Sequence, residues 1–316
     1  MRGCRTFGWV LSAPLLVSLC MAARAWAEVA VAEPAPTADE RAEPSLGEVN
    51  KQLTNPVSSL WSITFQQNNF KLDPGNGRAQ RWSSNLLLQP VLPIGISPDW
   101  NLITRPVVPL FVSQPHPDPK LGEPTHIGRS TAFGDITLLQ LVSPSPELAG
   151  NWLLGFGPSW IFPTAASDFT GSGKYQVGPA ALVGYLSDKW IVGALVQNWW
   201  SYAGSDSRPS TASMNLQPFA SYFLPDAWSI GYSGNILANW KNSATDSFTV
   251  PIGVSVAKVV RLGKLPVRIA LGGQWMPVQP DAYGQKWNIQ LVVAPVLPKL
   301  VKGYLTQPSE MSFGLK

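Results

Sequence analysis

Short runs of alternating apolar and polar residues recur through most of the chain. The runs that begin at Trp61, Trp228 and Trp287 alternate cleanly, and a period of two is that of a β-strand, whose successive side chains point to opposite faces. In the runs 131–143 and 190–202, apolar residues occupy both faces. The pattern predicts about twelve strands, near 57–68, 80–93, 100–112, 131–143, 151–163, 175–186, 190–202, 213–224, 228–240, 248–260, 265–276 and 285–297.

The connections between these strands alternate in length. The odd-numbered ones are long and polar (69–79, 113–130, 164–174, 203–212, 241–247 and 277–284), four of the others are tight turns, and the fourth, 144–150, is intermediate. A soluble sandwich has similar strands, but alternating long loops and short turns is typical of outer-membrane barrels. The sequence therefore predicts an all-β, antiparallel, up-and-down transmembrane barrel with both termini in the periplasm.

The tryptophans support this orientation. An indole combines a large apolar body with one N–H donor, which suits the boundary between lipid and water. In the predicted topology one set begins the upward strands at the periplasmic interface, namely Trp61, Trp100, Trp152, Trp190 and Trp228. The other set falls at the outer interface and includes Trp82, Trp160, Trp240, Trp275 and Trp287. Trp199 and Trp200 belong with the outer set. We expect these residues to form the two aromatic girdles of a membrane barrel.

The N-terminus is typical of a secretory signal peptide. Arg2 and Arg5 precede an apolar stretch, and Ala25-Trp26-Ala27 is a small-x-small cleavage site. The stretch is shorter than the roughly 20 residues of a spanning helix, so a membrane anchor is the weaker interpretation, as is a lipoprotein anchored at Cys20. Secretion and a barrel together predict the outer membrane of a Gram-negative bacterium.

The segments that flank the predicted barrel differ in composition from it. The sequence divides into a signal peptide (1–27), a periplasmic linker with a short helix (28–54), the barrel (55–298) and a C-terminal tail (299–316). The linker is rich in alanine, proline and acidic residues, and 46–53 could form one or two helical turns. It is either an ordinary tail or a plug that enters the lumen.

Cysteine and charge narrow the functional classes. Cys4 and Cys20 both lie in the predicted signal peptide, so the mature chain would have no disulfide, redox pair or thiolate metal site. Processing would leave 20 basic and 19 acidic residues. A nearly balanced charge gives no sign of nucleic-acid binding. The expected partners are membrane lipids, small solutes and, during biogenesis, the barrel-assembly machinery.

Charged and amide side chains on the strands are the candidate lumenal residues. Arg105, Asp135 and Arg268 are predicted to lie within strands, opposite the more apolar face, and Gln89 and Gln274 add neutral polar groups. A charge at membrane depth is a functional hypothesis because it needs water or a partner. These residues either form a selective constriction or a polar network that holds the wall together.

Catalytic chemistry is not expected. The two histidines, His116 and His126, share the predicted loop 113–130, whereas a Ser-His hydrolase of the barrel type needs a strand histidine beside a serine. We predict no enzymatic activity, no cofactor and no metal site. Several prolines within predicted strands (Pro90, Pro106, Pro158, Pro179, Pro218 and Pro251) interrupt the ladders, which calls for bulges or for lateral openings in the wall.

Several short motifs resemble a known family. The sequence is similar to the bacterial outer-membrane proteins named for the "meta-pathway of phenol degradation", often mislabelled neuromedin U. The resemblance covers roughly 50–298 and rests on 55–57 (NPV), 65–68 (FQQN), 88–93 (LQPVLP), 100–105 (WNLITR), 134–136 (GDI), 157–158 (GP), 162–165 (FPTA), 178–180 (GPA) and 216–219 (LQPF). It implies a membrane barrel with a transport role and brings no established substrate or functional residues. The tail after residue 297 departs from the family pattern.

The sequence thus predicts a channel for passive uptake of small, hydrophobic or aromatic solutes. The alternative is a structural or surface-interaction barrel with a blocked lumen, which acts through its extracellular loops.

Overall fold

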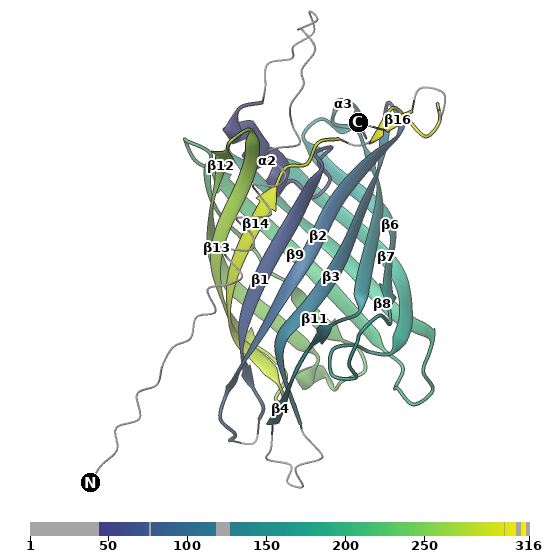
Figure 1. Ribbon diagram of the computed structural model, residues 1–316, viewed down its shortest axis with the longest axis vertical. Coiled ribbons are helices and arrows are strands. Elements are labelled where there is room, and N and C mark those ends of the chain that lie inside the picture. The colour runs from purple at the N-terminus through teal and green to yellow at the C-terminus, as the bar shows by residue number, and fades with distance from the viewer. Residues whose placement is uncertain (1–43, 76, 118–126, 300, 308–310, 314–316) are drawn as a thin grey trace, which may run out of the picture. The chain divides into compact units, whose positions relative to one another are not determined.

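The computed structural model describes residues 44–75, 77–117, 127–299, 301–307 and 311–313, and residues 44–316 form one compact unit. Most of the described residues belong to one antiparallel sheet that curls into a barrel (Figure 1). Its strands are β1 (Ser62–Asp73), β2 (Arg81–Ser97), β3 (Trp100–Pro117), β4 (Ile127–Phe133), β5 (Ile136–Pro144), β6 (Trp152–Phe162), β7 (Lys174–Leu186), β8 (Trp190–Gly204), β9 (Ala212–Phe223), β10 (Trp228–Ser233), β11 (Ile236–Asn239), β12 (Phe248–Leu262), β13 (Leu265–Val278) and β14 (Gly284–Pro295). Outside the sheet lie α2 (Leu46–Thr54), α3 (Pro146–Ala149), η2 (Ala244–Asp246) and the small hairpin β15 (Val301–Lys302) and β16 (Ser312–Phe313).

The sheet is closed. β1 pairs with β2 on one side and with β14 on the other, so the first and last barrel strands meet. β4 and β5 both pair with β3, and β10 and β11 both lie between β9 and β12, so each couple forms one interrupted strand. The 14 segments of the sheet therefore make twelve barrel strands, as the sequence predicted. Closure leaves no open edge, as a membrane requires.

Most of the predicted strand boundaries agree with the structure. β6, β7 and β9 begin and end within one residue of the predicted 151–163, 175–186 and 213–224. The prediction 57–68 was wrong: β1 covers 62–73, because the residues just before it belong to the N-terminal segment instead of the barrel wall. β3 also continues to residue 117, five residues beyond the predicted end.

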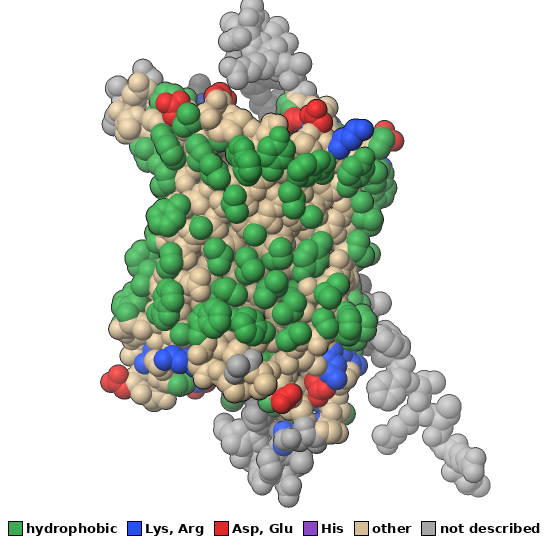
Figure 2. All heavy atoms as spheres, turned by 180° about the vertical axis from the view of Figure 1, so that it is seen from behind, with side chains coloured by type: hydrophobic (Ala, Val, Ile, Leu, Met, Phe, Trp, Pro, Cys, Tyr) green, Lys and Arg blue, Asp and Glu red, His purple; other side chains and the backbone are tan. Residues whose placement is uncertain are grey.

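Alternation along each strand separates an outer from an inner face. On β13, Ile269, Leu271 and Trp275 are exposed, whereas Ala270 and Gln274 are buried inside the barrel. Figure 2 shows the result on one face of the outer surface, where hydrophobic side chains are spread over the barrel and the charged ones lie at its two ends. Among the described residues, no helix has the length and hydropathy to cross a membrane.

The strand prolines coincide with irregular pairing. The register of β2 with β3 runs from Leu88↔Val108 directly to Leu92↔Thr104, and Pro90 and Pro106 fall in the gap. The register of β7 with β8 skips the residue pairs around Pro179, where a Cβ on the preceding Gly178 would lie only 1.9 Å from the carbonyl oxygen of Asn198. A further register shift falls at Pro251. The prolines are therefore accommodated by local bulges and gaps in the ladders.

Exposed tryptophans surround both ends of the barrel. Of the ten predicted girdle residues, eight are exposed: Trp100, Trp152, Trp190 and Trp228 at the end of the short turns, and Trp82, Trp240, Trp275 and Trp287 at the end of the long loops. Several of these rings have aromatic or cationic neighbours. Trp275 lies 6.3 Å from Trp287 between centroids, and the ammonium groups of Lys71 and Lys258 lie 5.0 and 4.8 Å from the rings of Trp82 and Trp228.

Trp61 does not follow this pattern. Its side chain is only 7% exposed, and its indole N–H donates a 2.8 Å hydrogen bond to the carbonyl of Pro93. The expectation that it belongs to the periplasmic girdle was wrong, because the residue lies in the connection between the N-terminal segment and β1. Trp160 is half-buried.

The C-terminal tail is attached to the barrel. Tyr304 forms a parallel bridge with Gly95 of β2, and the amides of Leu305 and Thr306 donate to the carbonyls of Gly95 and Ile96. At this point β2 extends beyond the start of β1, so the tail covers a short stretch of strand edge. A Cβ on Gly95 would lie 2.7 Å from the Tyr304 ring, so this close approach depends on glycine.

Candidate functional site: the barrel lumen

One wall of the lumen is a network of side-chain amides. Asn68 on β1 lies at its centre. It donates to Asn85 of β2 (2.9 Å) and accepts from Gln66 (3.2 Å), from Gln290 (3.0 Å) and, at 3.4 Å, from Asn288 of β14. Asn68 and Asn288 are each 3% exposed. Because buried amides are costly unless bonded, this mutual pairing allows the polar groups to line the wall.

The network extends to both sides of β1. On one side Asn288 donates to Gln274 of β13 (3.1 Å), which donates in turn to the carbonyl of Ser233 (3.1 Å). On the other side Gln89 of β2 donates to Gln66 (3.1 Å) and accepts a hydrogen bond from the Arg105 guanidinium. The sequence-predicted residues Gln89, Gln274 and Arg105 therefore belong to one connected set. We call it the amide wall: Gln66, Asn68, Asn85, Gln89, Arg105, Gln274, Asn288 and Gln290.

Arg268, the second predicted lumenal arginine, stays outside this network. It is on the inner face of β13, where it makes no hydrogen bond or ion pair with another described residue, and its Nε is buried. The Nε of Arg105 is likewise buried without a partner. Two guanidinium groups that are taken out of bulk water without a carboxylate carry a large desolvation cost.

Among the described residues, no acidic side chain pairs with either of these two charges. Within the described part of the chain, every aspartate and glutamate lies in a helix, turn, loop or strand interruption, or, for Asp73, at the last position of its strand. Asp73 itself pairs with Lys286 at 2.8 Å. The described interior thus has an excess of positive charge at Arg105 and Arg268. A water-filled path beside such charges favours anions over cations.

A second wall, in the half of the barrel next to the short turns, is apolar, whereas farther toward the long loops the same strands carry buried polar side chains such as Ser159 and Gln197. Its buried side chains pack together on the inner faces of the strands from β3 to β9, and they comprise Ile103, Leu139, Leu141, Leu153, Ala180, Leu182, Ile191, Leu195 and Phe219. We call this set the apolar wall. Ile103 lies two residues before Arg105 on the same face of β3, so the two walls meet on that strand.

Sequence analysis missed the apolar wall, although a signal was present. The runs 131–143 and 190–202 have apolar residues on both faces, which weakened their prediction as barrel strands. In the structure their inner faces supply Leu139, Leu141, Ile191 and Leu195. Apolar residues on both faces of a membrane strand therefore indicate an apolar lumen at that position.

Asp135 makes its hydrogen bonds with a loop and not with the amide wall. It belongs to the two-residue interruption between β4 and β5, so its placement within a strand was wrong. Its carboxylate accepts from the amide (2.6 Å) and hydroxyl (2.8 Å) of Ser172 and from the amide of Ala165 (3.2 Å). The charge thus fastens the loop between β6 and β7 to the barrel.

The N-terminal segment packs into the end of the barrel that carries the short turns. α2 begins at Ser45, whose hydroxyl caps the amide of Glu48 (3.2 Å), and it ends before Asn55-Pro56. Val49 and Asn50 are buried, with Val49 against Ala227 and Val259. The helical turns predicted near 46–53 are confirmed.

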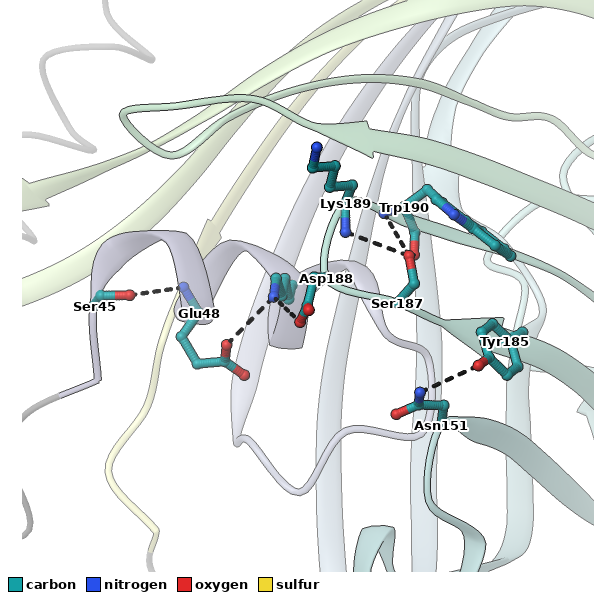
Figure 3. Close-up of polar contacts among 9 residues, drawn as sticks. Ser45, Glu48, Asn151, Tyr185, Ser187, Asp188, Lys189 and Trp190 are labelled. Atoms are coloured by element: carbon teal, nitrogen blue, oxygen red, sulfur yellow. Dashed lines mark hydrogen bonds and ion pairs between the residues drawn. The ribbon is translucent and has the colours of Figure 1, made fainter.

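Polar contacts hold α2 on two sides. Asn50 donates to the carbonyl of Ala227 (3.1 Å). On its other side Lys51 lies 3.5 Å from Asp188 in the turn between β7 and β8 (Figure 3). Beyond the helix, Val57 packs against the apolar wall, where a Cβ on Gly155 would lie 3.5 Å from it. Segment 46–60 is therefore bound to the short-turn end of the barrel.

A cavity of about 280 Å³ lies at the long-loop end. It is formed by the outer ends of β1, β2, β3 and β14 with the loop between β6 and β7. His116 and Phe169, which both line it, stack directly on each other with ring centroids 3.6 Å apart and an interplanar angle of 7°. The lining comprises Phe70, Leu72, Ser83, Asn85, Phe111, Gln114, Pro115, His116, Phe169, Tyr283 and Gln285.

The remaining candidates are metal binding and the two histidines, considered for the described residues. These residues include no group of three or more His, Cys, Asp or Glu side chains arranged to hold a metal. The placement of His116 in a loop was wrong: it lies near the end of β3, where it pairs with Gly128 of β4, because β3 extends beyond its predicted end. His126 lies outside the described residues.

A closed twelve-stranded antiparallel barrel with an apolar outer surface and a partly polar interior is the architecture of bacterial outer-membrane proteins. The chain is of this class. Its fold is similar to that of the COG4313 outer membrane channel from Pseudomonas putida F1, with a TM-score of 0.54 and 16% identity over 84% of this chain and 100% of that one.

Two other solved structures are similar at a lower level. The NanC porin has a TM-score of 0.44 and 7% identity, and covers 75% of this chain and 99% of its own. The Pseudomonas putida toluene transporter TodX has a TM-score of 0.40 and 8% identity, and covers 78% and 92%. No protein-family model matches the sequence, and no curated protein matches it. The resemblance to the phenol-degradation family therefore stays a prediction.

Proposed function

We propose that this protein is a passive outer-membrane channel for small solutes with a hydrophobic or aromatic body. The observation that carries the proposal is the two-sided lumen, in which an amide wall meets an apolar wall. A solute that has both an apolar body and a hydrogen-bonding group could contact both walls at once. The fold shared with an outer membrane channel supports the same function.

In this proposal the lumenal arginines tune selectivity. Arg105 lies where the two walls meet, held by Gln89, and Arg268 has no partner among the described residues. Both charges are positive, so we expect the conductance to favour anions. We assign Asp135 to holding the loop between β6 and β7, to which its carboxylate is hydrogen-bonded.

Location and partners belong to the same proposal. Residues 1–27 would be removed as a signal peptide after export. The barrel-assembly machinery would insert the chain into the outer membrane, with the long loops outside. The exposed tryptophans at both ends would contact the lipid headgroup regions.

The test is conductance and solute flux with the purified mature chain in planar bilayers and liposomes. We expect current and flux in the wild type, and a reduced conductance in Gly155→Trp, because Gly155 faces the lumen beside Leu141 and Val57. Leu154→Trp is the matched control: the neighbouring side chain is exposed on the outer face. Wild-type protein that folds but gives neither current nor flux would refute the channel.

One observation favours a second function, a barrel with a blocked lumen that acts through its loops. Segment 46–60 and the apolar wall pack together at the short-turn end. A chain shortened to begin at residue 61 shows whether segment 46–60 or the apolar wall closes the lumen. If only the shortened chain conducts, the segment is a plug. If neither conducts, the lumen is closed by the wall itself.

A further inference from the structure

We propose that the cavity at the long-loop end is a binding site for a neutral, planar ring that carries one hydrogen-bonding substituent. An external solute would meet this site first on its way into the barrel. In that respect the inference rests on the proposed channel function. Binding at the site can nevertheless be measured without transport.

The walls of the cavity provide ring faces. Phe70 and Phe111 come from β1 and β3, Phe169 from the loop between β6 and β7, and Tyr283 from the segment before β14. With His116, which is stacked on Phe169, they surround the space from several sides. Aromatic pairs favour offset-stacked and edge-to-face contacts, so a planar ligand gains more here than a flexible chain of equal area.

The floor of the cavity supplies uncharged polar groups. Ser83, Asn85, Gln114 and Gln285 line it, and the Ser83 hydroxyl donates to Gln114 at 2.8 Å. The Tyr283 hydroxyl is buried and has no hydrogen-bond partner in the described structure. A ligand carbonyl that accepts from this hydroxyl would remove the cost of an unsatisfied donor.

The charge of the lining selects a neutral ligand. Of the described residues that line the cavity, none is Lys, Arg, Asp or Glu. Transfer of an ionised carboxylate into such a space is unfavourable without a cationic partner. The unpaired lumenal cations, Arg105 and Arg268, are not among the lining residues.

The size of the cavity limits the ligand. A cavity of roughly 150 Å³ lined by apolar groups admits benzene, so about 280 Å³ has room for one substituted ring. The cavity also continues into the amide wall, since Asn85 both lines it and accepts from Asn68. A ligand amide that leaves the cavity could exchange its hydrogen bonds with that wall.

Benzamide and benzoate are a suitable probe pair, because they have nearly the same shape and differ in charge. Binding to the full chain in detergent micelles is measured by saturation-transfer NMR titration at neutral pH, with empty micelles as the blank. We expect benzamide to bind about tenfold or more tightly than benzoate, because the described lining residues include no lysine or arginine to pair with a carboxylate. Equal binding, or tighter binding of benzoate, would overturn the proposal.

Two variants assign the binding to this cavity. Phe169→Ala removes a ring face and should weaken benzamide binding about tenfold. Tyr283→Phe keeps the ring and removes the donor, and should weaken it about threefold. The control is Phe133→Ala, whose side chain is 53% exposed on β4, and binding should not change. If Phe169→Ala unfolds the loop, Tyr283→Phe still tests the site. Unchanged binding in Tyr283→Phe would show that the Tyr283 hydroxyl does not donate to the ligand.

Flux of benzamide through liposomes carrying the protein is measured separately. Saturable binding without flux would leave the site standing and refute the channel. Flux without the binding difference between wild type and variants would support the channel and refute the site.

Discussion

The amide wall and the apolar wall occupy the same barrel, yet they are stabilised in different ways. In the amide wall each buried carboxamide depends on a partner on a neighbouring strand, as Asn68 does on Asn85 and Asn288. In the apolar wall, side chains such as Ile103 and Leu141 need only close contact and the exclusion of water. The hydrogen bonds of the amide wall depend on direction, whereas the apolar contacts of the apolar wall do not.

The difference predicts unequal tolerance to substitution. A polar group placed in the apolar wall finds no partner, because its neighbours are hydrocarbon. An amide removed from the amide wall leaves partners unbonded, but other amides remain nearby. A charge is tolerated where the two walls meet, as Arg105 shows by its hydrogen bond to Gln89.

The largest effect is expected from Leu141→Asn. This side chain is 1% exposed in the apolar wall, so the amide would be buried without a partner and a packed leucine would be lost. The free energy of unfolding should fall by about 3–5 kcal/mol, measured by urea titration of the barrel in lipid vesicles. Leu305→Asn, in the exposed tail, is the control and should change little. A loss below about 1 kcal/mol would contradict a dry, packed wall.

A smaller loss is expected from Asn68→Ala, which removes the centre of the amide wall. Four side chains lose a bond to it, and the cost should be about 1–3 kcal/mol. Asn69→Ala changes the same residue type on the opposite face of β1, where the described structure shows one bond, from Ser84. Equal losses in the two variants would show that the wall is not a network.

The smallest effect on stability, but a clear one on selectivity, is expected from Arg268→Met. The unpaired guanidinium contributes a desolvation cost, so its removal should leave the free energy of unfolding within about 1 kcal/mol of wild type or raise it. The anion preference, measured as the reversal potential in a salt gradient, should decrease. Lys258→Met, on the outer face against Trp228, is the control for charge alone. A strong loss of stability would mean that Arg268 has an anionic partner.

Much of the fold was predictable because a membrane barrel obeys local rules. Alternation gives the strands, turn length gives their direction, and the boundary preference of tryptophan gives their ends, so β6, β7 and β9 could be placed within one residue. Each of these signals depends on a residue and its near neighbours in sequence. The failure at Trp61 has the same origin, because nothing local distinguishes the first strand from the segment that leads into it.

The candidate site was only partly predictable. Alternation along the strands was enough to assign Gln89, Arg105 and Gln274 to the inner face. The structure joins them in one network. Asn68, the centre of that network, was missed, and Asp135 was misplaced because the break between β4 and β5 is invisible in the sequence pattern. The aromatic cavity combines residues from five separated segments, and no local pattern indicates that they meet.

The sequence by itself determined the class of fold: a barrel of about twelve antiparallel strands with an apolar outer surface. Those properties follow from period-two alternation and from connection lengths, both of which depend only on residues that are close in sequence. The tertiary structure alone decided which inner faces meet, and hence that amides gather on one wall, leucines on the other and aromatic rings at the long-loop end. Closure sets these neighbours, because pairing β1 with β14 brings together residues more than 200 positions apart.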